Sequence, residues 1–335
     1  ASEYVTDFYL QNKLEYWNLN LVYGIRFENT EQHWNVPYLI KVQDTIANAP
    51  RPYYLDVLPS ANLKYQINSK MNLRFGFYKS IVRPQFSEYI PVSSGISSTD
   101  NSKTQGDPFI KHSVAFNYDI RYEFYPNNQD VYMFGLFAKK INNAIETKYS
   151  NVNSAITSKN PYNVPTVTNR GFEINIIKYL NKIRLLRNFG FNFNYTYVLS
   201  EVKTLKNEIT PIKLDSNHYT SREQTRSFQY QSKDLFNASL FYNLKKLGLY
   251  TQISYLYQGK RLYNVSLEYD LDWYQKPYEN LSFSVEKKFG QHFSLSFKLN
   301  NLLNSPFDVA INRLNETVQY DTYGQTYQMG LRYKL

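Results

Sequence analysis

Apolar and polar residues alternate strictly along most of the chain, and this pattern is the strongest constraint on its fold. In residues 114–124 every second side chain is apolar, and the residues between include Asn117, Asp119, Arg121 and Glu123. The same alternation recurs in residues 19–27, 293–299 and 327–335. A period of two is the repeat of a β-strand with one apolar and one polar face. The sequence therefore predicts an all-β fold.

The lengths of the predicted strands and of their connections favour a membrane-spanning sheet. About 13 strands can be drawn, most of about 11 to 17 residues, whereas soluble strands average about five or six and a tilted membrane strand needs about 9 to 11. Short connections near 15–18, 68–70, 126–130, 181–188, 243–248 and 290–292 alternate with long ones near 30–53, 85–108, 150–163, 203–231, 259–277 and 304–323. This segregation is typical of a transmembrane antiparallel up-and-down β-barrel with short periplasmic turns and long outer loops.

The composition supports this reading over a soluble one. The chain has 33 Tyr and 22 Phe but no Cys, and its longest apolar run, residues 131–138, is too short for a transmembrane helix, which needs about 18 residues. A soluble sandwich or propeller is the alternative for an alternating sequence. It would leave a large aromatic stripe in water, and no repeat of propeller length is visible.

Charged residues on the polar faces of the strands are expected to line the lumen. An Arg or Lys on the lipid face costs about 2 to 4 kcal/mol at the membrane midplane. Phe116→Arg is therefore expected to block assembly, and Asn117→Arg to be tolerated. The predicted inward set is Arg26, Glu28, Lys64, Arg74, Asp119, Arg121, Glu123, Glu173, Glu286, Lys288, Lys298, Arg332 and Lys334. Most should pair with a plug or across strands, and Arg26, Arg74 and Arg121 are candidate contacts to a substrate.

The net charge of +10 does not indicate nucleic-acid binding, because lysines and arginines are scattered without a block of five or more. Among the aromatics, Trp17 beside a short turn is expected in the periplasmic girdle. Trp34 and the adjacent Trp273 and Tyr274 fall in long outer loops, where flat rings can stack on a sugar or an aromatic siderophore. Packing of these rings onto the barrel rim is the alternative.

Catalytic and metal chemistry find little support. The four histidines are dispersed, so only His218 with Asp215 suggests a dyad, and solvated loop residues are the simpler explanation. Glu268, Asp270 and Asp272 alternate along one edge and could hold calcium, but the spacing lacks the glycine turn of an EF-hand loop. A polar strand extension is favoured. We expect no enzyme, no cofactor and no catalytic residue.

Several motifs resemble the barrel of TonB-dependent receptors, in particular the Bacteroidetes type. Residues 58–65 (LPSANLKY), followed by Asn72-Leu73-Arg74 and Arg83-Pro84-Gln85-Phe86, are similar to a hairpin of that family. Further matches are Gly106-Asp107-Pro108, residues 117–123 (NYDIRYE), residues 169–173 (NRGFE), residues 300–304 (NNLLN) and the closing strand from Gly324. Two departures are Gln325, where the family often has Arg, and Leu335, where assembly signals usually end in Phe.

The resemblance implies an outer-membrane barrel of 22 strands with a plugged lumen, of which residues 1–335 would be the C-terminal part, about strands ten to twenty-two. The plug and the early strands would lie outside these residues. The implied function is TonB-dependent import of a scarce nutrient, which could be a glycan, peptide, siderophore or vitamin. Implied partners are outer-membrane lipid, the TonB complex through the plug, and a surface lipoprotein. The alternatives are a structural or assembly subunit of an outer-membrane complex and an open porin-like channel.

Overall fold

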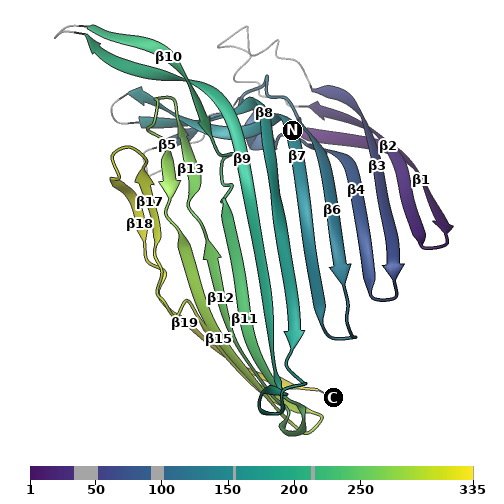
Figure 1. Ribbon diagram of the computed structural model, residues 1–335. Coiled ribbons are helices and arrows are strands. Elements are labelled where there is room, and N and C mark those ends of the chain that lie inside the picture. Colours follow the sequence, from purple (N-terminus) through teal and green to yellow (C-terminus); the bar gives the residue numbers. More distant parts are fainter. Residues whose placement is uncertain (34–51, 92–101, 154–155, 213–215, 335) are drawn as a thin grey trace.

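The computed structural model describes residues 1–33, 52–91, 102–153, 156–212 and 216–334, and these form nineteen strands of one extended sheet (Figure 1). The long strands are β1 (Ser2–Tyr16), β2 (Leu19–His33), β3 (Tyr53–Asn68), β4 (Met71–Val82), β6 (Ser113–Phe124), β7 (Val131–Asn153), β8 (Ile156–Tyr179), β9 (Phe189–Ile212), β11 (Asp234–Leu244), β12 (Leu249–Gln258), β15 (Tyr278–Phe289), β16 (Phe293–Asn300) and β19 (Thr326–Tyr333). Shorter elements are α2 (Phe86–Tyr89), β5 (Ser102–Thr104), β10 (Ser216–Arg226), β13 (Arg261–Ser266), β14 (Trp273–Gln275), β17 (Phe307–Ile311) and β18 (Thr317–Asp321), with 3-10 turns η2 (Arg184–Leu186) and η3 (Lys245–Leu247).

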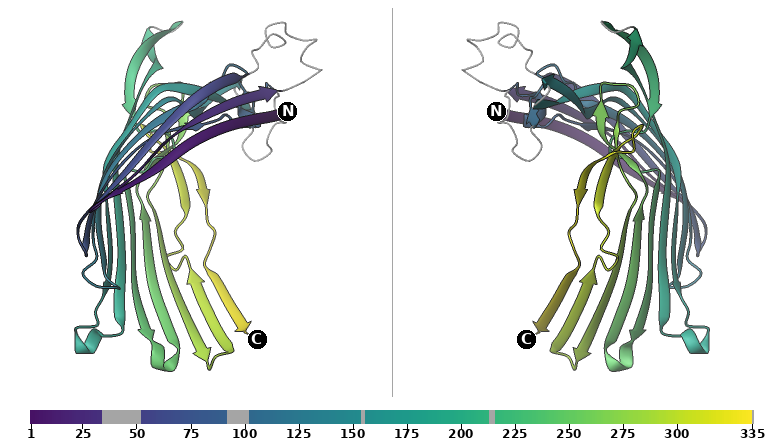
Figure 2. Two further views of the ribbon diagram at one scale, coloured as in Figure 1. Left: turned by 90° about the vertical axis from the view of Figure 1, so that its right-hand side faces the viewer. Right: turned by 90° about the vertical axis from the view of Figure 1, so that its left-hand side faces the viewer.

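The long strands pair antiparallel in chain order, from β1 through β19, without a crossover. Strands β1 and β19 each have one partner along the described part of the chain, so the sheet is a curved, open wall rather than a closed cylinder (Figure 2). No helix among the described residues is long and apolar enough to cross a membrane. The prediction of an up-and-down antiparallel sheet is confirmed.

The two rims of the sheet differ as the connection lengths predict. The short turns gather at one rim, where the β1–β2 turn consists of Trp17 and Asn18; Trp17 adopts a positive φ of 51° and stacks on Tyr16. The opposite rim carries α2 and all the short strands. Four predicted loops were wrong in part. Strands β7–β8 and β9–β10 continue as hairpins through 150–163 and 203–231, and β13, β14, β17 and β18 lie within 259–277 and 304–323. The sequences of the hairpin extensions mix apolar and polar residues without strict alternation, so they lack the period-two signal.

The strand register separates an apolar convex face from a polar concave face. Outward side chains such as Leu10, Tyr118 and Leu136 are about half exposed, whereas the inward carboxylates Glu28 and Glu123 are nearly inaccessible. Neighbouring side chains on the polar face cover these carboxylates.

One inward residue departs from the expectation. Asn117 is only 5% exposed and its amide donates to the carbonyl of Tyr78 (3.2 Å) and to Ser80 Oγ (3.2 Å). An arginine there would lose both bonds, so the structure favours a destabilising effect of Asn117→Arg over the expected tolerance.

Candidate functional site

The first part of the concave face, across β1–β6, carries ion pairs between neighbouring strands. Arg26 contacts Asp7 (3.2 Å) and Glu28 (2.6 Å), and Arg83, from the segment after β4, also pairs with Glu28. Asp7 and Glu28 are direct cross-strand neighbours, so their like charges need the arginines between them. The predicted substrate contact Arg26 is therefore engaged with two carboxylates of its own sheet.

A second charged group lies beside the first, at the upper end of β3. Asp56 is the cross-strand neighbour of Glu28 and binds Lys79 (3.4 Å) and His112 Nε2 (3.0 Å). The ring of Tyr54 stacks on His112 with ring centroids 3.8 Å apart. Burial lowers the pKa of His112 below its usual value, and Asp56 opposes this shift. The imidazole is therefore held in an apolar contact that favours its neutral form.

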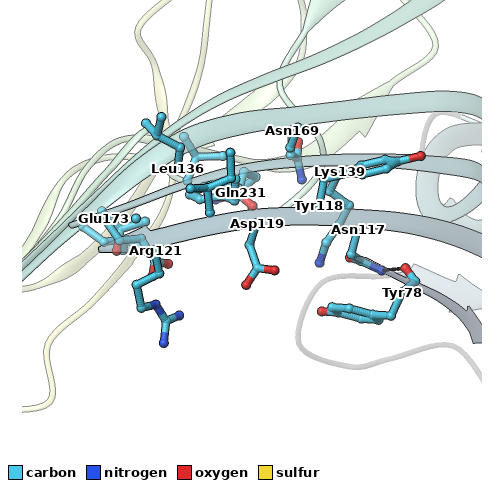
Figure 3. Close-up of a pocket in the computed structure, with 17 residues that line it drawn as sticks. Tyr78, Asn117, Tyr118, Asp119, Arg121, Leu136, Lys139, Asn169, Glu173 and Gln231 are labelled. Carbon is cyan, nitrogen blue, oxygen red and sulfur yellow. Dashed lines mark hydrogen bonds between the residues drawn. The ribbon is translucent and has the colours of Figure 1, made fainter. Parts of the chain in front are cut away.

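Arg74 and Arg121 are cross-strand neighbours with different partners. Arg74 Nε binds Glu123 (2.7 Å), whose other oxygen accepts from Asn72. Arg121 makes no ion pair among the described residues and extends into a hollow of ≈ 350 Å³ (Figure 3). Other inward side chains of this hollow are Asn117, Asp119, Lys139, Asn169, Glu173 and Gln231. Of the three predicted arginines, Arg121 is thus the one whose charge has no carboxylate partner among the described residues.

Aromatic rings gather at the long-loop rim, where the β12–β15 connection meets the β7–β8 hairpin. Trp273 packs against Tyr149 with ring centroids 5.4 Å apart, and β13 pairs in parallel with β7 at Lys148 and Tyr149. A second group, Tyr230, Tyr263 and Phe307, is joined by edge-to-face contacts of 5.8 and 5.4 Å. Together these five residues are the rim aromatic cluster. Lys159 lies over Tyr149 and Arg261 over Tyr230.

The predicted Trp273–Tyr274 pair does not form one surface. Consecutive residues of a strand point to opposite faces, so Tyr274 turns away and lies under the ammonium of Lys260 (4.5 Å). Burial raises the pKa of Tyr274 to about 12. Trp34, the third predicted aromatic contact, lies outside the described residues.

Two buried ion pairs hold the rim strands together. Arg226 of β10 forms a two-pronged contact with Glu146 of β7 (2.9 and 2.6 Å), and both side chains are nearly inaccessible. The phenol of Tyr162 donates to Glu146 Oε2 (2.7 Å), and the backbone N–H of Gln229 donates to Oε1 (2.8 Å). Every oxygen of this carboxylate is satisfied, as a buried charge requires.

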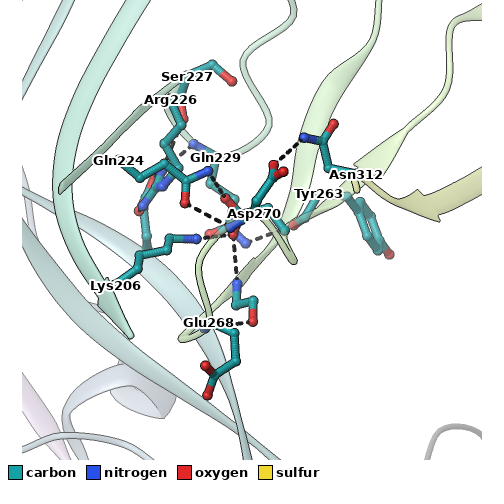
Figure 4. Close-up of polar contacts among 12 residues, drawn as sticks. Lys206, Gln224, Arg226, Ser227, Gln229, Tyr263, Glu268, Asp270 and Asn312 are labelled. Carbon is teal, nitrogen blue, oxygen red and sulfur yellow. Dashed lines mark hydrogen bonds and ion pairs between the residues drawn. The ribbon is translucent and has the colours of Figure 1, made fainter. Parts of the chain in front are cut away.

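Lys206 and Asp272 form the second pair, close to the first (Figure 4). Asp272 Oδ1 also accepts from the backbone N–H of Ser266 (2.9 Å), and Oδ2 from Gln224 (3.3 Å). Burial lowers the pKa of Lys206, and Asp272 opposes this shift. Asp272 is thus a loop anchor, while Asp270 accepts from the amide of Asn312 (2.8 Å). Among the described residues no group of three or more His, Asp or Glu side chains is placed to hold a metal.

Sequence reasoning missed the partners that make up these groups. Tyr149, Tyr230 and Tyr263 come from three different connections, and Glu146 is 80 residues from Arg226. No spacing rule relates such residues.

Comparison with known proteins then identifies the fold. The sequence model of the TonB dependent receptor-like β-barrel matches residues 2–302. The chain belongs to this family. A search among curated proteins finds no match.

Solved structures of the family share the fold at low sequence identity. They include the ferric enterobactin receptor PfeA of Pseudomonas aeruginosa in its G324V form (15% identity, TM-score 0.62), the siderophore receptor PirA of Acinetobacter baumannii (16%, 0.64) and the FrpB iron transporter of Neisseria meningitidis in its F3-3 variant (12%, 0.63). Each match covers 99% of this chain but only 45%, 46% and 44% of the relative. The chain thus spans less than half the length of these relatives.

Family membership confirms the predicted transmembrane β-barrel and its place in the outer membrane of a Gram-negative bacterium. The family consists of receptors and transporters, in agreement with the prediction of a non-enzymatic protein. The Bacteroidetes-type resemblance stays a prediction.

Proposed function

We propose that this chain forms the later wall of a TonB-dependent importer, which captures a scarce nutrient at its outer rim and passes it through the lumen. The observation that carries the proposal is the family match over residues 2–302, on a sheet whose concave face is polar and charged. A polar lumen behind an apolar outer face suits the passage of a hydrophilic solute. The solute belongs to one of four classes: glycan, peptide, siderophore or vitamin.

The rim aromatic cluster is the proposed capture site, because it combines flat rings with adjacent polar groups. Tyr230 is 52% exposed and adopts a left-handed conformation (φ 64°) in the middle of the β10–β11 loop, which Gln229 ties to the carbonyl of Thr147. The buried Glu146–Arg226 pair fixes this loop to the β7–β8 hairpin. A rigid platform lowers the ordering cost of binding.

The remaining parts of the importer follow from the family. We propose that residues 1–335 are the C-terminal part of the barrel, that a plug and early strands in the rest of the protein fill and close it, and that the TonB complex acts through that plug. Outer-membrane lipid faces the convex side. A surface lipoprotein over the rim completes the proposed set of partners.

Uptake measurements test the proposal. Deletion of the gene should abolish growth on one nutrient supplied as the single source, and deletion of TonB should have the same effect. In the full-length protein, Trp273→Ala should weaken capture of that nutrient, measured as the half-saturating concentration for uptake. Trp17→Ala is the matched control, because Trp17 lies on the opposite rim and is 89% exposed.

Normal uptake in both deletion strains would contradict import. If those strains instead failed to export or assemble other outer-membrane proteins, the structural or assembly role would be the function. A Trp17→Ala effect equal to that of Trp273→Ala would remove the rim as the capture site.

A further inference from the structure

Two sectors of the concave face differ in chemistry. Strands β1–β6 carry the ion pairs described above, whereas the inward positions of β9 (190–200), β11 (235–243) and β12 (250–258) include no Asp, Glu, Lys or Arg. These three strands and β15 lie side by side (Figure 1), and the centre of their inward face presents mostly amides and hydroxyls. We call the central part the neutral wall: Asn192, Asn194, Asn237, Ser239, Ser254 and Ser282.

The register arranges the neutral wall in rows. Asn192, Ser239, Ser254 and Ser282 are consecutive cross-strand neighbours on four strands, and Asn194 and Asn237 stand opposite each other in the next row. The six side chains line a hollow of ≈ 340 Å³. Neighbouring strands are about 4.8 Å apart and successive inward residues of one strand about 6.7 Å apart. Hydrogen-bonding groups therefore recur at short steps in both directions.

Such a surface suits movement better than fixed binding. Hydroxyl and amide groups can each donate and accept, and one such bond contributes only about 0.5–1.5 kcal/mol net. A solute can exchange one bond for an equivalent one in the next row, which keeps each position shallow. Conduction requires sites that are weak and multiple.

The charged sector has the opposite property. Its carboxylates and cations are concentrated in pairs such as Arg26–Glu28 and Arg74–Glu123. A partner with complementary charges binds such a surface in one register, because like-charge contacts in any other register are costly. This sector suits a domain that is held in place.

We propose that the neutral wall is the side of the lumen along which the solute passes, and that the solute presents uncharged hydroxyl or amide groups to it. The charged sector then holds the static part of the plug. The inference rests on the proposed import function and adds the path that the imported solute takes through the lumen.

Cysteine labelling can locate the path, because the chain has no cysteine of its own. Ser254→Cys and Ser282→Cys report on the neutral wall, and Asn62→Cys, inward on β3, is the matched control in the charged sector. Each is made in the full-length protein, with any cysteine outside these residues replaced. Intact cells are treated with three maleimides, which carry a glucose group, an uncharged dipeptide or a sulfonate.

The wall cysteines should react about tenfold faster in cells with an active TonB complex than in cells without it, as expected when a minor open state becomes the major one. The labelling rate of Asn62→Cys should be the same in both kinds of cell. The two uncharged reagents should show the acceleration. The ratio of their labelling rates at the wall cysteines tells whether hydroxyl or amide groups pass better.

Each of the other possible labelling results would overturn one part of the proposal: the path, the uncharged solute or the import function. Acceleration at Asn62→Cys but not at the wall would reject the path and leave import intact. Equal or greater acceleration with the sulfonated reagent at the wall would reject the uncharged solute. No TonB-dependent change at any position, together with normal nutrient uptake without TonB, would reject the import function itself.

Discussion

Strand β11 offers a stringent test of the facing assignment, since Ser239 and Leu240 are adjacent but point to opposite sides. Leu240 is outward and 45% exposed, and Ser239 is part of the neutral wall. The eleven residues of β11 span about 37 Å at ~3.4 Å each, or about 28 Å of membrane depth at a tilt of ~40°. The apolar band is about 25 Å tall, so both residues lie near its middle.

Leu240→Arg should therefore cost about 2 to 4 kcal/mol of unfolding free energy, the range for an arginine on the lipid face at the midplane. Ser239→Arg should stay within about 0.5 kcal/mol, since its guanidinium reaches a wet lumen. Urea unfolding of the full-length protein in phospholipid vesicles measures both. Equal losses for the two variants, or a larger loss for Ser239→Arg, would refute the assignment of the faces.

Three further predictions concern the rims. Glu146→Gln should destabilise the folded protein by about 3 to 5 kcal/mol, because it leaves the Arg226 charge buried without its counter-ion; urea unfolding should show the Glu146→Gln/Arg226→Met double variant losing less. His112 has a folded-state pKa below its unfolded value of about 6.5, so its stabilising contribution is complete above about pH 6.5 and is lost as the pH falls below that value toward the folded-state pKa; His112→Gln should flatten this part of the stability–pH curve. Gly248→Ala should lower the melting temperature more than Gly290→Ala: both have φ near +60°, but only at Gly248 would the new Cβ meet a carbonyl oxygen, at 2.8 Å.

The transmembrane sheet could be predicted from sequence because facing is a local property. Whether Phe116 and Asp119 point outward or inward depends only on their parity along one strand, and the lipid and the lumen select opposite residue types. The same holds for the turns, where residues 17–18 need only a compact connection. The sequence of each strand therefore indicates which of its side chains face lipid and which face the lumen, without information from the other strands.

The rim and the state of the inward charges could not be predicted in this way. Whether Arg26 is free or neutralised depends on Asp7 across the strand and on Arg83, which follows β4. Likewise Trp273 meets Tyr149 only because β13 crosses to the β7–β8 hairpin. Apart from the Arg26–Asp7 pair, these contacts join segments more than 50 residues apart, and parity along one strand carries no information about any of them.

The separation of paired and unpaired charges bears on which solutes the lumen can accept. Because Arg26 and Arg74 are neutralised by neighbouring carboxylates, the positive charge of the chain is not spread evenly over the concave face. Arg121 and Lys139 make no ion pair among the described residues and line one hollow, where Asp119 and Glu173 lie beside them. An anionic solute would bind there in a fixed place, whereas an uncharged one would gain nothing from that hollow and could move along the neutral wall. The charge of the solute therefore decides which of the two hollows it uses, and Arg121→Gln should impair the import of an anion while sparing that of a neutral solute.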